Sequence, residues 1–334
     1  MDMATLAKLA GVSTSTISRA FHAPHKVQHA TRERILALAK EHNYVYNAVA
    51  GDLSRKVSRL IGVLIPTSNK SVFGDTLLAI QEAAQEYHFA TIIGSTFYDK
   101  EREKMILQEF QERRVSGIIL TGFTIGQEQS VADLIKNEIA CVVIWEKLED
   151  QDFSYVGFDN YEAAYSAVDY LLSLRHKRIG LLIGHYDKVG RVKKRFLGYQ
   201  RALVDYGVAF DPSLVITSDP DFMEGKQAMH QLLSVPDPPT AVFAASDRLA
   251  IGGLAAIKEK GLKVPEDISL VGFDDVDFAS FCDPPLTTVR VPAQKIGQLA
   301  VRTVAEAIEK DQYHIRKYCL DTELIIRNSC RMAD

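Results

Sequence analysis

Residues 2–21 read DMATLAKLAGVSTSTISRAF, and this stretch determines how the first part of the chain folds. Two short runs carry apolar residues at helical spacing and can each bury one face: Leu6, Leu9 and Ala10, then Ile17, Ala20 and Phe21. Between them, Gly11 fits the left-handed position that ends a helix, and Ser13 can cap the next helix. The pattern predicts a helix-turn-helix, although an ordinary helical hairpin has the same spacing.

The second helix of this motif, at about residues 13–21, exposes short hydrogen-bonding side chains and one arginine: Thr14, Ser15, Thr16, Ser18 and Arg19. Such groups can bond base edges and phosphates. A third helix is expected over about residues 30–42 and would close a small all-α cluster of about 45 residues. Its predicted core is Leu6, Leu9, Ile17, Phe21, Ile35 and Leu38. We therefore assign residues 1–46 to a helix-turn-helix DNA-binding head.

The charge distribution separates this head from the rest of the chain. The 334 residues have a net charge of −4, which by itself argues against a nucleic-acid partner. Residues 1–59, however, hold nine Lys and Arg against four Asp and Glu, a net charge of +5, and the remainder carries −9. A basic head on an acidic body is expected where one module alone contacts phosphate.

Several classes of site and location are disfavoured by the composition. The four cysteines, Cys141, Cys282, Cys319 and Cys330, lack the paired spacing of a zinc site or a disulfide framework. No apolar run approaches about 18 residues, and nothing resembles a signal peptide. We expect a cytoplasmic protein with no metal, no cofactor and no membrane contact.

From residue 60 onward, apolar runs alternate with amphipathic helices. The runs that read as buried strands lie at 60–66, 89–95, 117–122, 140–145 and 155–159, and then at 179–184, 214–218, 241–246 and 268–274. This alternation predicts two doubly wound parallel sheets, and ligands bind at the carboxyl ends of such strands. We place the first lobe at about 60–158 and 290–318, the second at about 159–289 and 319–330, and a hinge or linker at 47–59.

Long motifs run along the whole chain: LAGVSTSTISRAF (9–21), VQHATRERILALAKEHNYVYNAVA (27–50), RRVSGIIL (113–120), RFLGY (195–199), TAVFAASDRLAIGGLAAIKEKGLKVPEDISLVGFDD (240–275) and PPLTTVRVP (284–292). In this order and spacing they resemble the LacI/GalR family of bacterial transcriptional regulators. Shorter stretches, such as FYDKEREK (97–104), are similar to the gluconate-repressor branch. The resemblance implies a periplasmic-binding-protein-like body and a homodimer that reads a pseudo-palindromic operator.

The resemblance also implies which residues contact DNA. Base-contacting positions fall on Thr14, Ser15 and Arg19, and Arg19 is the best candidate for a bidentate guanine contact. Phosphate-contacting positions fall on Ser13, Thr16, Ser18, Tyr44 and Asn47, although Tyr44 could instead pack the hinge onto the head. In the hinge, Ala50 is a further DNA-contacting position, and Leu53 corresponds to a minor-groove wedge or else to a linker core residue. Gly51 and Asp52 depart from the family pattern.

The resemblance places a small-molecule effector between the lobes. The positions that line this cleft are Phe73, Trp145, Glu146, Arg195, Ser246, Asp247 and Asp274. Phe73 could be a plain core residue, Trp145 could stack on a sugar or pack between the lobes, and Asp247 could be a helix N-cap. The basic segment at 191–195 favours an acidic effector, such as a sugar acid or a sugar phosphate, unless it is a solvated face.

The sequence therefore predicts a ligand-responsive DNA-binding regulator, more typical of a repressor than of an activator, with a sugar or sugar-acid effector. We find no nucleophile–base signature, no GxGxxG after a strand and no P-loop, so we expect no catalysis. One alternative is a solute-binding protein of a transport system, which would share the two-lobed body but not bind DNA. Another is an enzyme on a doubly wound fold.

Overall fold

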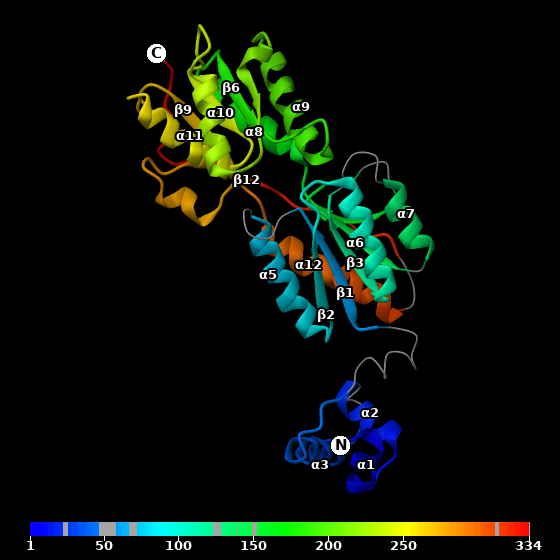
Figure 1. The fold of residues 1–334 in the computed structure, drawn as a ribbon. Helices are drawn as coiled ribbons and strands as arrows, with labels where there is room; N and C mark the ends of the chain where they lie inside the picture. Colours follow the sequence, from blue (N-terminus) through cyan, green and yellow to red (C-terminus); the bar gives the residue numbers. More distant parts are fainter. Residues whose placement is uncertain are drawn as a thin grey trace. The chain divides into compact units, whose positions relative to one another are not determined.

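The computed structural model describes residues 1–22, 26–46, 58–66, 72–122, 128–137, 139–148, 152–310 and 314–333. It divides the chain into two compact units, Met1–Arg59 and Leu60–Asp334, which we call the head unit and the body and describe separately (Figure 1). In the described residues, no helix is both long enough and apolar enough to cross a membrane.

The described part of the head unit contains three helices, α1 (Met3–Ala10), α2 (Thr14–His22) and α3 (His29–Glu41). Local chemistry sets the ends of the first two helices. The carboxylate of Asp2 accepts a hydrogen bond from the backbone N–H of Thr5 at 2.8 Å and caps α1. Gly11 ends α1 in the left-handed conformation, with φ +62°. The two helices and the tight turn between them form the predicted helix-turn-helix.

The core of the head unit is built mainly from small and branched side chains. Its buried residues are Leu6, Ala7, Ala10, Ile17, Ala20, Ile35 and Ala39. Leu9 was predicted to lie in this core, and that prediction is wrong, because its side chain is 51% exposed. The apolar stripe of α1 passes through Ala7 instead, since Ala7 and Leu6 lie on the side that faces α2 and α3.

The first lobe of the body is a six-stranded parallel sheet in the order β11-β5-β4-β3-β1-β2. Its strands are β1 (Leu60–Ile65), β2 (Ala90–Ser95), β3 (Gly117–Thr121), β4 (Ala140–Ile144), β5 (Ser154–Gly157) and β11 (Lys317–Cys319). Its helices are α5 (Phe73–Glu86), α6 (Lys100–Glu112), α7 (Glu128–Lys136) and α12 (Ala293–Lys310). Helices α5 and α12 lie side by side against the sheet (Figure 1).

The second lobe has the same plan, with the strand order β12-β10-β9-β8-β6-β7. Its strands are β6 (Ile179–Ile183), β7 (Val215–Thr217), β8 (Ala241–Ala244), β9 (Ser269–Asp274), β10 (Thr287–Arg290) and β12 (Glu323–Ile325). Its helices are α8 (Asn160–Ser173), α9 (Gly190–Asp205), α10 (Phe222–Leu232) and α11 (Asp247–Glu259), with 3-10 turns η2 (Pro212–Leu214) and η3 (Asp277–Phe281). Together the two sheets confirm the predicted fold class.

Two short strands near the end of the chain differ from the predicted pattern. Strand β12 pairs antiparallel with β10, which departs from a purely parallel arrangement. Strand β11 was not predicted, because Lys317–Cys319 is only three residues long and has no apolar run. In the described residues the chain passes between the lobes after β5, after β10 and after β11, so three segments connect the two sheets. The carboxyl ends of β4 and β9 carry Trp145 and Asp274, which were predicted for the effector site.

Candidate functional site

The surface of α2 presents short hydroxyl groups and one guanidinium. Ser13, Thr14, Ser15 and Arg19 are exposed, whereas Thr16 and Ser18 are half-buried. The hydroxyl of Ser13 caps α2 by accepting the N–H of Thr16 at 3.2 Å. It also lies 2.8 Å from the Ser15 hydroxyl and 2.9 Å from the Thr16 hydroxyl. A hydroxyl cluster at a helix N-terminus suits a phosphate oxygen, because the backbone N–H groups there attract negative charge.

Two tyrosines that follow α3 pack onto α2. Tyr46 stacks on Phe21 with ring centroids 5.2 Å apart, and its hydroxyl lies 2.9 Å from that of Ser18. Tyr44 lies 6.0 Å from Phe21 in a tilted arrangement, and burial raises the pKa of its hydroxyl. Tyr44 therefore packs against Phe21 of the head, and the phosphate contact expected at its position stays a prediction. Asn47, Ala50 and Leu53, together with Gly51 and Asp52, lie outside the described residues.

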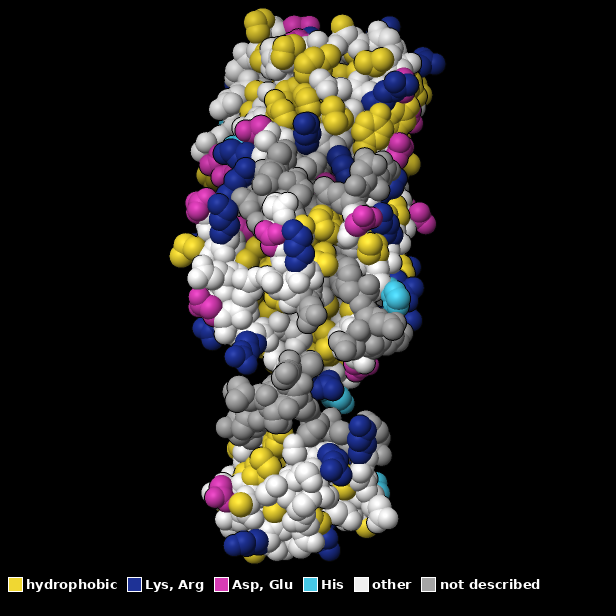
Figure 2. Space-filling view, turned by 90° about the vertical axis from the view of Figure 1, so that its right-hand side faces the viewer, with side chains coloured by type: hydrophobic (Ala, Val, Ile, Leu, Met, Phe, Trp, Pro, Cys, Tyr) yellow, Lys and Arg dark blue, Asp and Glu magenta, His cyan; other side chains and the backbone are white. Residues whose placement is uncertain are grey.

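Basic side chains are prominent on the head unit. Figure 2 shows more Lys and Arg side chains than Asp and Glu side chains on the surface of this smaller unit. Arg19 on α2 and Arg34 on α3 both belong to its exposed residues. This agrees with the excess of basic residues before residue 60, and it provides the charge that a phosphate backbone requires.

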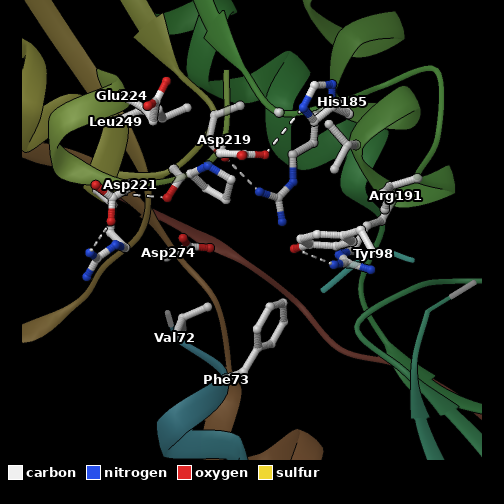
Figure 3. Close-up of a pocket in the computed structure, with 18 of the residues that line it drawn as sticks. Val72, Phe73, Tyr98, His185, Arg191, Asp219, Asp221, Glu224, Leu249 and Asp274 are labelled. Atoms are coloured by element: carbon white, nitrogen blue, oxygen red, sulfur yellow. Dashed lines mark hydrogen bonds and ion pairs between the residues drawn. The ribbon is translucent and has the colours of Figure 1, made fainter. Parts of the chain in front are cut away.

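A cavity of about 420 Å³ lies between the two lobes of the body (Figure 3). Five of the seven residues predicted for the effector line it: Phe73, Trp145, Arg195, Ser246 and Asp274. Phe73 comes from the start of α5 in the first lobe, while Arg195, Ser246 and Asp274 come from the second. The cavity is large enough for a small metabolite and has both apolar and charged walls.

Arg195 is fixed in the cavity wall by its own lobe. Its Nε donates to Asn160 Oδ1 at 2.8 Å, and its Nη1 donates to the carbonyl of Ala245 at 2.8 Å. The guanidinium carbon lies 3.7 Å from the centroid of the Phe273 ring. Burial lowers the pKa of Arg195 to about 10, and Asp274 acts in the opposite direction. The group is therefore a pre-positioned cation with N–H groups left for a ligand oxygen.

Asp274 ends β9 in a strained backbone conformation, with φ +119°. Burial raises the pKa of its carboxyl to about 7, while Arg195 and a hydrogen bond with Ser246 lower it. Trp145, after β4 in the other lobe, also has a positive φ of 70°. Strained residues of this kind often mark functional sites, because the surrounding fold must hold them in place.

The indole of Trp145 packs against protein side chains, which favours the packing alternative over stacking on a sugar. It is 1% exposed, and its ring meets that of Phe73 edge-on at 5.0 Å. The indole Nε1 donates to the hydroxyl of Thr76 at 3.2 Å. Trp145 therefore packs at the crossing between the lobes and contributes only a small area to the cavity wall.

Glu146 and Asp247 are not among the residues that line this cavity. Asp247 is buried beneath it and accepts hydrogen bonds from the Thr288 hydroxyl at 2.5 Å and the N–H of Val276 at 2.9 Å. It is also not the N-cap of α11, because Ser246 takes that position and accepts the N–H of Arg248 at 3.3 Å. Glu146 is buried beside Lys194, whose Nζ lies 3.4 Å from Glu146 Oε1.

Several polar and charged cavity residues were missed by the sequence reasoning. They are Tyr98, His185, Arg191, Asp219, Asp221, Glu224 and Arg248. His185 lies 3.3 Å from Asp219, and Arg248 lies 3.2 Å from Asp221, so part of this charge is paired (Figure 3). Arg191 was the one with a signal, the basic run at 191–195. This run is not a solvated face as a whole, because Arg191 and Arg195 are both buried.

Among the residues that the structure describes, no group of three or more His, Cys, Asp and Glu side chains could hold a metal ion.

Comparisons with known proteins cover both units. A family model described as "Bacterial regulatory proteins, lacI family" matches residues 2–47, and one described as "Periplasmic binding protein-like domain" matches residues 168–330. The HTH-type transcriptional repressor CytR of Escherichia coli (strain K12) is 35% identical over 329 residues, which cover 98% of this chain and 96% of that protein. The ribose operon repressor of Haemophilus influenzae is 30% identical, and the alignment covers 98% of each chain.

Solved structures agree with the relatives. The Lac repressor dimer bound to operator and the anti-inducer ONPF matches with a TM-score of 0.84 and 27% identity, covering 99% of each chain. The transcription regulator GntR from Chromobacterium violaceum matches with a TM-score of 0.74 and 30% identity, covering 81% of this chain and 98% of that one. Both alignments include the body that contains the cavity.

Proposed function

This chain belongs to the LacI family of bacterial regulatory proteins and is a DNA-binding transcriptional repressor, and we propose that a sugar or sugar acid controls it. In this proposal the protein acts in the cytoplasm as a homodimer whose paired heads read a pseudo-palindromic operator. It performs no catalysis. The likeness to the gluconate-repressor branch remains a prediction.

The observation that carries the effector proposal is that a buried guanidinium, Arg195, and a buried carboxyl group, Asp274, both line the inter-lobe cavity. A fixed guanidinium donates hydrogen bonds and a carboxylate accepts them, so together they suit neighbouring hydroxyl groups. Phe73 on the other lobe offers an apolar face for a sugar ring. Arg195 can also hold the carboxylate of a sugar acid bidentately.

Exposed apolar side chains support the dimer. Leu78, Met223, Phe278 and Phe281 are 56%, 60%, 69% and 84% exposed. A contiguous patch of such side chains is typical of protein interfaces, and in this proposal the dimer buries these four. A two-fold dimer would present two copies of α2, and its symmetry would match that of the operator.

We also propose the division of the chain that the sequence predicted. Residues 1–46 form the DNA-binding head, 47–59 the hinge and 60–334 the effector-binding and dimerisation domain. The first lobe takes residues 60–158 and 290–318, and the second takes 159–289 and 319–330. The DNA contacts proposed from the family pattern are Ser13, Thr14, Ser15, Thr16, Ser18, Arg19, Tyr44, Asn47, Ala50 and Leu53.

A thermal-shift screen with sugars, sugar acids and sugar phosphates tests the effector proposal. A compound that binds the cavity should raise the melting temperature of the wild type and of Lys193→Ala, whose side chain is exposed. The same compound should not raise that of Arg195→Ala. An equal rise in Arg195→Ala would place the ligand elsewhere. Deletion of residues 1–58 should abolish DNA retention and keep effector binding, and DNA retention by that truncated chain would contradict the assignment of the head.

A further inference from the structure

Two basic side chains at the start of α9 extend from the second lobe to the first. They are Arg191 and Lys194, which lie three residues apart and so on neighbouring positions of one helix face. Arg191 is only 3% exposed. Its Nη1 donates to the carbonyl of Thr121 at 3.1 Å, and its Nη2 donates to the hydroxyl of Tyr98 at 3.3 Å. Both acceptors belong to the first lobe, and Figure 3 shows Arg191 beside Tyr98 at one side of the cavity.

Lys194 makes a second connection to the same lobe. Its Nζ donates to the carbonyl of Lys147 at 2.6 Å and lies 3.4 Å from the Glu146 carboxylate. The Glu146 side chain is 5% exposed and that of Lys194 is 35% exposed, so the pair is partly buried and water screens it less than a surface pair. Lys194 is not among the residues that line the cavity. The connection thus lies behind the effector site and does not contribute to its wall.

Two glycines provide the space that these connections occupy. Gly122 follows β3 with φ +67°, and a Cβ at this position would lie 2.6 Å from Arg191 Nη1. Gly190 begins α9, and a Cβ there would lie 3.0 Å from Glu146 Oε1. Gly122 belongs to the first lobe and Gly190 to the second. The lack of a side chain at both positions allows Arg191 and Glu146 to approach the backbone of the opposite lobe closely.

We infer that Arg191 and Lys194 are positioning residues that tie the two lobes together around the cavity before any effector binds. The inference goes beyond the proposed function, because it holds whatever ligand the cavity takes. The three hydrogen bonds have charged donors, which makes them stronger than bonds between neutral groups; the one to Thr121 is buried, and those to Tyr98 and Lys147 are partly buried. An effector would then meet a cleft that this chain has already closed, so its apparent affinity would depend on the strength of the tie.

Trp145 provides a probe that needs neither effector nor DNA. It is the only tryptophan in the sequence, and it is 1% exposed at the crossing between the lobes. Trp145 lines the inter-lobe cavity, and its carbonyl accepts a hydrogen bond from Asn160 of the second lobe. If the lobes separate, this cavity opens and this bond breaks, so the indole becomes more accessible to water and to acrylamide. Its emission should then move to longer wavelength, and its quenching constant should rise.

The test compares Lys194→Ala with Lys193→Ala, which removes the same charge from the neighbouring exposed position of α9. Lys194→Ala should shift the emission and raise the quenching constant, Lys194→Arg should restore both, and Lys193→Ala should match the wild type. Arg191→Ala should change both signals in the same direction. Far-UV circular dichroism checks that each variant is folded, and Glu146→Gln replaces Lys194→Ala if that variant does not fold.

Unchanged emission and quenching in folded Arg191→Ala and Lys194→Ala would overturn the inference. An equal change in Lys193→Ala would also overturn it, because the effect would then follow the charge and not the contact. Neither result would affect the proposed effector site, which the thermal-shift screen tests separately.

Discussion

The side-chain amide of Asn160 donates a hydrogen bond to the main-chain carbonyl of Trp145 at 2.9 Å, where the chain passes from the first lobe to the second. The same Asn160 accepts the Nε of Arg195, and the indole of Trp145 donates to Thr76. Thr76 in turn donates to the carbonyl of Ala293 at 3.1 Å. A continuous line of hydrogen bonds therefore joins the cavity wall to the first turns of α5 and α12.

Replacing Asn160 tests the strength of this line. Asn160 is fully buried, so Asn160→Ala leaves the Trp145 carbonyl and the Arg195 Nε without these partners. We expect the free energy of unfolding to fall by about 1–3 kcal/mol, as measured in urea. Asn328→Ala, at an exposed position, is the control and should stay within about 0.5 kcal/mol of the wild type. Equal stability of the two variants would contradict the role of Asn160.

Gly122 tests whether Arg191 needs the space beside it. Gly122 and Gly207 have the same φ of +67°, but a Cβ at Gly207 would meet nothing within 4 Å. Both Gly→Ala variants should carry a backbone cost of about 1–2 kcal/mol. Gly122→Ala should be less stable than Gly207→Ala in urea unfolding, because it alone displaces the guanidinium. If the two losses are equal, Arg191 accommodates the added carbon without cost.

The carboxyl of Asp274 predicts a dependence of stability on pH. Burial raises its pKa from 3.8 to about 7, so the folded protein holds a proton that the unfolded chain releases in between. The stability that this proton contributes is present below about pH 4 and is lost as the pH rises through about 7. The wild type should therefore lose more melting temperature between pH 5 and pH 8 than Asp274→Asn, which cannot ionise. Parallel pH profiles would contradict the raised pKa.

Arg19 is expected to contact a base. Replacing a second exposed arginine, Arg34, distinguishes this base contact from a general attraction between positive charge and phosphate. Arg19 and Arg34 are both exposed on the head unit. Arg19→Ala should reduce the discrimination between operator variants at one position of each half-site, by about 1–3 kcal/mol. Arg34→Ala, on α3, should weaken binding to all sequences about equally. Titrations of labelled operator variants at fixed salt, followed by fluorescence anisotropy, measure both effects.

Features that depend on neighbouring residues were predictable from the sequence. Gly11 and Ser13 determine the turn of the head through their own backbone and side chain, and the apolar runs predicted strands β1 to β9. Arg195 and Asp274 were found because long motifs resemble a known family. Such motifs carry information about three-dimensional contacts that periodicity lacks.

Features that depend on packing between distant segments were not predictable. Tyr98 lies in a loop of the first lobe, and His185 and Asp219 lie in two loops of the second, so the cavity brings together segments that are distant in sequence and no local pattern marks them. Asp247 occupies a position that the family resemblance assigns to the cleft, yet its carboxylate accepts hydrogen bonds from Thr288 and Val276 beneath the cavity. Leu9 fits the helical spacing, but the neighbouring helices cover Ala7 instead.

Selection of DNA from a random pool by the purified full-length chain tests the central claim most directly. The account predicts enrichment of a two-fold symmetric site by the wild type. It also predicts that Arg19→Ala enriches a site in which the same position of each half has lost its preferred base. Failure to enrich any sequence, an asymmetric site, or an unchanged preference in Arg19→Ala would contradict the account of a dimer that reads its operator through α2.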